Sequence, residues 1–226
     1  MVLRRHLLSW SMSCFLTLSC AQLFAQGVAG KVCKPISQRT QEVGCWIIAD
    51  DPVGQLKKSP VFWHLDVYAT RNKAEADKGP RSTIFESLGK VWLMTIENEK
   101  WRSPHGNHLA KIGPLPIAAA EEYSAQYMEA IFTPGMIAPA HIHSGPEAWY
   151  TMAGETCLET SDDRVQVGRA GGPAVIVPAG LSMHLTATGT EQRRALVLIL
   201  HETSKPATTQ VNDWQPKGLC KMREGK

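Results

Sequence analysis

The chain has 226 residues, of which 43% are hydrophobic and 20% charged, as in ordinary globular proteins. This length suits one sizeable domain, or one domain with an extension. The formal charge of +3 falls by two, to +1, once residues 1–25 are set aside, because that segment holds two arginines and no acidic residue. So small a charge indicates no basic surface for nucleic acid or for a membrane.

Residues 1–25 have the features of a signal peptide. Arg4 and Arg5 give a positive start, residues 7–24 are largely apolar, and Ala25 is a small residue before the expected cleavage site. The apolar run is too interrupted to favour a stable membrane span. The paired arginines resemble a twin-arginine export signal, and an ordinary secretory signal is the alternative. The sequence therefore predicts a periplasmic or secreted protein.

Residues 26–117 read as a small α/β extension that no family resemblance covers. Strands are expected over 43–49 and 61–69, followed by a short helix over 71–78 and by one long strand or two over 83–97. Thr70 is the expected N-cap of the helix. His105 and His108 form an H-x-x-H pair in a loop-like segment, which is a weak second candidate for metal binding. The prolines and glycine of 113–116 predict the boundary with the next unit.

Four cysteines remain beyond the signal peptide, an even number that suits disulfides in an oxidising compartment. They allow three pairings. We favour Cys33 with Cys220, which would tie the two ends of the chain to the domain, and Cys45 with Cys157.

Residues 123–132 form the first expected strand of the second unit. One face carries Tyr123, Ala125, Tyr127, Glu129 and Ile131, and the other carries Ser124, Gln126, Met128, Ala130 and Phe132. Both faces hold polar groups, so the sequence leaves open which of them lines an interior.

The segment 135–154 carries the strongest chemical signal in the chain. His141 and His143 alternate with Ile142 in a strand, so their imidazoles point to the same side. Ser144, Gly145 and Pro146 have turn chemistry, which can direct Glu147 back toward the same point. An H-x-H pair alone is more often a surface or core pair, but two imidazoles and a carboxylate suit a transition metal.

A second segment, 172–184, brings one more histidine. It reads as a short buried strand, a turn at Pro178 to Gly180, and then His184 at the start of the next strand. Further on, Arg193 and Arg194 are expected in a solvated turn before a buried strand over 195–200. Together the two segments predict a metal site of His141, His143, Glu147 and His184.

These two segments resemble the paired motifs of the cupin superfamily. The first is matched at Gly135, His141, His143, Glu147 and Gly154. The second is matched at four positions with two departures: three residues rather than two separate Gly180 from His184, and Thr188 stands near the family's asparagine; the matched positions are Gly172, Pro178, Gly180 and His184. The resemblance covers roughly residues 118–203 and implies a mainly β protein, a double-stranded jelly-roll barrel with the metal inside.

The predicted organisation is a signal peptide (1–25), an N-terminal α/β extension (26–117), a cupin barrel (118–205) and a C-terminal tail (206–226). The resemblance implies a divalent transition metal, which is Mn, Fe, Ni, Cu or Zn, and a small-molecule substrate or ligand. It implies dioxygenase-like chemistry with Glu147 as a catalytic base, and often a homodimer. A non-catalytic cupin that binds or senses a metal or small molecule is the alternative, and a metal-free cupin with a histidine-lined pocket is the third.

Overall fold

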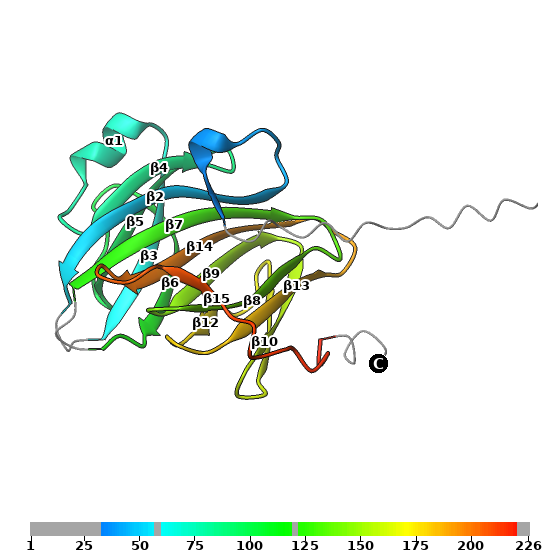
Figure 1. Ribbon diagram of the computed structural model, residues 1–226. Helices are drawn as coiled ribbons and strands as arrows, with labels where there is room; N and C mark the ends of the chain where they lie inside the picture. The colour runs from blue at the N-terminus through cyan, green and yellow to red at the C-terminus, as the bar shows by residue number, and fades with distance from the viewer. Residues whose placement is uncertain (1–32, 57–59, 119–121, 221–226) are drawn as a thin grey trace, which may run out of the picture.

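Three stacked β-sheets make up the computed structural model, which describes residues 33–56, 60–118 and 122–220 (Figure 1). The middle sheet, here called the central sheet, has six strands in the order β1 (Lys34–Pro35), β2 (Gly44–Gln55), β7 (Glu122–Phe132), β14 (Arg193–Glu202), β9 (Glu147–Ala153) and β12 (Val175–Val177). The predicted signal peptide lies outside the described residues. Within these residues, no helix is long and apolar enough to cross a membrane.

A five-stranded sheet faces one side of the central sheet and completes the barrel. Its order is β11 (Val165–Arg169), β10 (Glu155–Thr160), β13 (Met183–Thr188), β8 (Ile137–His143) and β15 (Thr208–Gln210). From β7 to β15 the chain passes repeatedly from one sheet to the other, pausing only for the β10–β11 hairpin. This is the double-sheet jelly-roll that the sequence predicts.

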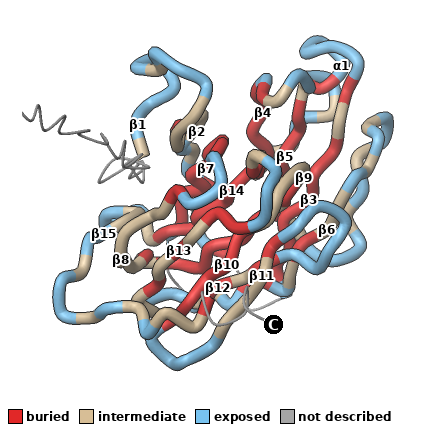
Figure 2. The backbone as a smooth tube through the Cα atoms, turned by 90° about the vertical axis from the view of Figure 1, so that its right-hand side faces the viewer, coloured by how far each residue is buried: buried red, intermediate tan, exposed pale blue. Residues whose placement is uncertain are grey.

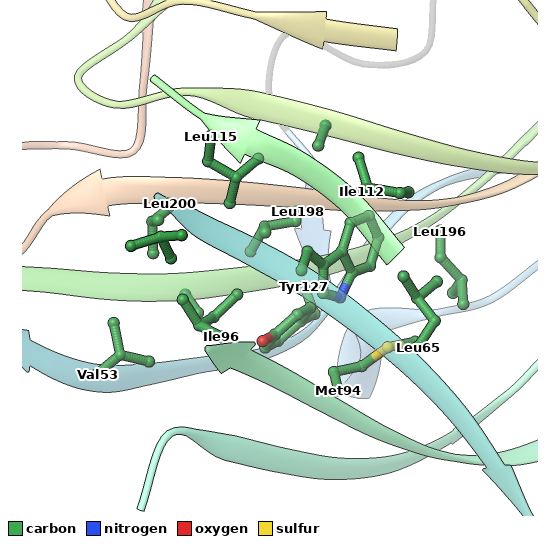
Figure 3. Close-up of a cluster of buried hydrophobic side chains, with 14 of the residues drawn as sticks. Val53, Leu65, Met94, Ile96, Ile112, Leu115, Tyr127, Leu196, Leu198 and Leu200 are labelled. Carbon is green, nitrogen blue, oxygen red and sulfur yellow. The ribbon is translucent and has the colours of Figure 1, made fainter. Parts of the chain in front are cut away.

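A four-stranded sheet covers the other side of the central sheet. Its order is β4 (Ser82–Ser87), β5 (Lys90–Asn98), β3 (Val61–Tyr68) and β6 (Asn107–Leu115), and α1 (Arg71–Ala76) and a short 3-10 turn (Ile36–Gln38) accompany the sheets. Figure 3 shows Leu65, Met94 and Ile112 of this sheet meeting Tyr127 and Leu198 of the central sheet in one apolar cluster. As predicted, Thr70 caps α1 by accepting a hydrogen bond from the Lys73 N–H.

The two faces of β7 serve two different cores. Tyr127 packs with Trp63 and Phe85 on the side of the four-stranded sheet. Met128 and Phe132 belong to a second cluster inside the barrel. The face that begins at Ser124 is therefore the interior face, which answers the question the sequence left open. In Figure 2 the buried backbone accordingly runs through the middle of the molecule, and exposed backbone lies at its margins.

Two predicted boundaries do not follow the strand order. The extension was expected to end before the barrel, yet β2 pairs with β7 along most of its length and so belongs to the central sheet. Only residues 61–115 form a separate layer. The predicted C-terminal tail is likewise part of the barrel, because β15 pairs with β8. In both cases a strand distant in sequence supplies hydrogen bonds that an edge strand needs.

The predicted cysteine pairing is wrong. Cys33 is bonded to Cys45, and Cys157 to Cys220. The first bridge joins β2 to the segment just before β1, and the second ties the end of the described chain to β10. Cysteine spacing alone cannot choose among three pairings, since the choice depends on which strands are neighbours.

A histidine and aspartate cluster lies on the outer face of the four-stranded sheet. His64 and Asp66 of β3 are fully buried; the His64 Nε2 donates to the Asn98 carbonyl at 2.9 Å. His108 contacts Asp66 at 3.0 Å, whereas His105 contacts Asp77 at 2.9 Å. The H-x-x-H pair is thus divided between two carboxylates, which gives no support to a shared metal site.

Removing the Cys157–Cys220 bridge should cost more stability than removing the other. Loop-closure entropy predicts losses of about 4 kcal/mol for a separation of 63 residues and about 3 kcal/mol for one of 12. Denaturant unfolding of the two double Cys→Ser variants measures both losses. Peptide mapping without reductant is the independent control; a Cys33–Cys220 peptide would contradict the structure.

The free energy of unfolding should decrease as the pH falls, and His64 should account for part of that decrease. Burial lowers the pKa of His64 from 6.5 to about 4, so between these values the unfolded chain takes up a proton that the folded protein refuses. The free energy of unfolding therefore decreases as pH falls through this window. A His64→Gln variant should show a shallower decrease, and the exposed His105→Gln control should follow the wild type. Equal slopes for wild type and His64→Gln would contradict this assignment.

Candidate metal and ligand site

A cavity lies inside the barrel, between the central and five-stranded sheets. Its volume is about 80 Å³, enough for several water molecules or a small organic molecule. Apolar side chains from both sheets form most of its walls, among them Met128, Phe132 and Val197. Four polar or charged side chains that could do chemistry also line it: His141, His143, Glu147 and Arg193.

Backbone carbonyls fix the two histidines of β8 in the same tautomer. The Nδ1 of His141 lies 2.7 Å from the Pro139 carbonyl, and the Nδ1 of His143 lies 2.8 Å from the Ala207 carbonyl. A carbonyl only accepts, so each Nδ1 carries the proton and each Nε2 keeps its lone pair. The ring centroids are 4.8 Å apart. This is the backbone support that metal-binding imidazoles generally have.

Glu147, the first residue of β9, lies close to His143. Its Oε2 lies 3.7 Å from the Nε2 of His143, and both atoms are buried without a hydrogen-bond partner among the described residues. Burial raises the pKa of Glu147, while His141 opposes that shift. Burial also lowers the pKa of His143 to about 4, which leaves its imidazole neutral near pH 7. Neutral imidazole is the form that ligates a metal. The raised pKa of Glu147 acts in the other direction, and a bound cation would favour its carboxylate form.

His184 is not brought into this group. Its neighbours Met183 and Leu185 line the cavity, and side chains alternate along β13, so His184 lies on the opposite side of the strand. The ladder between β13 and β8 shifts register at this point, but the shift leaves Met183, opposite His141, as the residue that faces inward. Two residues separate Gly180 from Met183, and this is the spacing at which the cupin pattern has histidine.

The donors do not form a complete metal site as they stand. Across residues 33–56, 60–118 and 122–220, no three His, Cys, Asp or Glu side chains are grouped closely enough to hold an ion. The donor set itself fits a metal. Two imidazoles with protonated Nδ1 atoms lie on β8, and a buried, unpaired carboxylate oxygen lies at the start of β9.

Arg193 is the site residue that the sequence reading missed. It was expected in a solvated turn, but it is 1% exposed and extends into the cavity. Its guanidinium carbon lies 5.0 Å from the Trp149 ring centroid and 5.5 Å from that of Phe132. Its neighbour Arg194 points outward and pairs with Glu42. Side chains alternate along β14, so the two arginines face opposite sides. A predicted strand that began at residue 193 rather than 195 would have indicated this.

No protein-family model and no curated protein matches the chain. Among solved structures, a cupin-like protein from Thermotoga maritima matches 45% of this chain and 75% of its own, with 17% identity and a TM-score of 0.39. The strand order itself shows the double-sheet barrel.

Two other similar solved structures are those of enzymes. Oxalate decarboxylase from Bacillus subtilis shares 23% identity over 47% of this chain and 29% of its own, with a TM-score of 0.32. An oxalate oxidase in complex with the substrate analogue glycolate shares 26% identity over 39% of this chain and 46% of its own, with a TM-score of 0.30. The chain thus spans less than half the length of either enzyme.

Two glycines of the cupin segment should respond differently to alanine. A Cβ at Gly145 would lie 1.8 Å from the Leu200 carbonyl oxygen, whereas one at Gly135 would meet nothing within 4 Å and only strain a backbone with φ of +84°. Gly145→Ala should cost about 3 kcal/mol or more, and Gly135→Ala about 1 kcal/mol. Denaturant unfolding measures both. Equal losses would show that the turn before Glu147 is not held against β14.

Proposed function

We propose that this protein is an exported cupin that holds a divalent transition metal and carries out dioxygenase-like chemistry on a small organic molecule. His141, His143 and Glu147 would hold the metal. The observation that carries the proposal is the pair of Nδ1–carbonyl contacts, which orient two lone pairs on one wall beside an unpaired carboxylate. Metal binding requires these three side chains to draw closer than they lie now.

Two imidazoles and one carboxylate are a donor set used by non-haem iron oxygenases. Mn, Fe, Ni, Cu and Zn all accept these donors. Any of them would supply a Lewis acid, and a redox-active one would also supply electrons for dioxygen. The chain's own part is to orient the substrate and exclude bulk water, since the walls around Met128 and Val197 are apolar and buried. Glu147 would accept a proton from the substrate.

Export is part of the same proposal. The first residues read as a signal peptide, and two disulfides suit an oxidising compartment. A twin-arginine route would export the protein already folded around its metal.

A non-catalytic cupin that binds a small molecule is the second candidate. The incomplete grouping of donors favours it, because the cavity can accept a ligand without any metal. The two candidates differ in metal content and in oxygen consumption.

Metal content tests the site directly. Protein purified from its own compartment should contain about one equivalent of transition metal by elemental analysis. His143→Ala should lose most of it, because two other donors hold an ion weakly, and His184→Ala should retain it. Loss of metal in His184→Ala would restore the four-ligand site expected from the sequence, and a metal-free wild type would contradict the proposal.

Oxygen uptake tests the chemistry. The metal-loaded protein is offered a panel of phenols, enols and diketones in an oxygen electrode. Uptake that disappears in His143→Ala and persists in His184→Ala supports the enzyme. Metal binding without uptake across the panel favours the binding protein.

A further inference from the structure

Arg193 is a buried cation with unused hydrogen-bond donors among the described residues. Its side chain is 1% exposed, and its Nε and Nη2 atoms have no hydrogen-bond partner among the described residues. A charged group buried without partners costs several kcal/mol relative to one in water. So costly an arrangement is understandable if the partner of the guanidinium is a molecule that enters the cavity.

The surroundings of Arg193 leave its in-plane donors available. The guanidinium lies near the rings of Trp149 and Phe132, which offer cation–π contacts but accept no strong hydrogen bonds. A guanidinium presents its N–H groups as a planar fork that matches a carboxylate in two parallel bonds. The structure thus presents a carboxylate-binding group on an apolar wall.

Glu147 does not neutralise Arg193 by direct contact. The two attract each other electrostatically, but the Oε2 of Glu147 is itself without a partner. Strand register explains the separation: Glu147 is opposite Ile199, whereas Ala153 is opposite Arg194, so the two residues start from opposite ends of the β9–β14 ladder. A small molecule can therefore contact Arg193 without displacing Glu147 from the histidines.

We infer that Arg193 binds the carboxylate of a small organic acid whose apolar body lies against Met128 and Val197. The inference rests on the proposed function, in that it names the substrate class of the same cavity. A volume of about 80 Å³ limits the acid to a few carbon atoms. The charges agree: Arg193 balances Glu147, so a divalent metal would leave the cavity positive and favourable to an anion.

The test uses the full chain as purified and measures binding by titration calorimetry. The probes are acetate, propionate and butyrate, each compared with its uncharged amide. The wild type should bind at least one carboxylate at least about tenfold more tightly than its amide. Arg193→Gln should lose that preference. The matched control Arg194→Gln changes a partly exposed arginine on the same strand and should keep the preference.

Two outcomes would overturn the inference. One is a wild type that binds no carboxylate more tightly than its amide, which decides the matter even when Arg193→Gln does not fold. The other is a folded Arg193→Gln variant with unchanged carboxylate affinity.

Elemental analysis of the same samples separates this inference from the proposed function. Metal retained in Arg193→Gln, together with a lost carboxylate preference, supports both. A metal-free wild type with an Arg193-dependent preference contradicts the metal proposal and leaves the carboxylate site standing. A metal-loaded wild type without that preference supports the metal proposal and contradicts the carboxylate site.

Discussion

Burial of the central sheet on both faces is the constraint on which the rest of the structure depends. β7 is paired along its length by β2 and β14, and its side chains alternate between two cores. A slip of one residue would exchange the faces and bring Tyr127 and Glu129 into the cavity. Because both cores oppose that slip, the wall that carries Met128 is fixed before any ligand binds.

The same constraint explains how charged side chains persist in an apolar cavity. Glu147 and Arg193 project from neighbouring strands of a sheet that cannot turn either of them out to solvent. Two opposite charges that do not touch are worse placed than a contact pair, so each is poised for an external partner. The free energy that holds them there comes from the packing of both layers, which the four-stranded sheet makes possible.

Local rules recover the part of the site that is built from one strand and the turn that follows it. His141 and His143 follow from the two-residue period of a strand, and Glu147 from the turn that Gly145 allows at its tight contact with Leu200. The mainly β class and the capped helix after Thr70 are recovered for the same reason. The disulfides, the place of β2 and the inward turn of Arg193 depend on which distant strands pair, and no local pattern carries that information.

The outward position of His184 changes the chemistry expected of the cavity. A match to the motif with one extra residue drew attention to His184, but strand alternation gives the inward position to Met183. A thioether carries no charge and is a soft donor, so it would neither neutralise a hard divalent ion nor bind it strongly. A metal held by His141, His143 and Glu147 would therefore keep a net positive charge and an open side. A carboxylate bound by Arg193 would suit both the positive charge and the open side of the metal. The outward position of His184 and the unpaired donors of Arg193 thus favour the same kind of ligand.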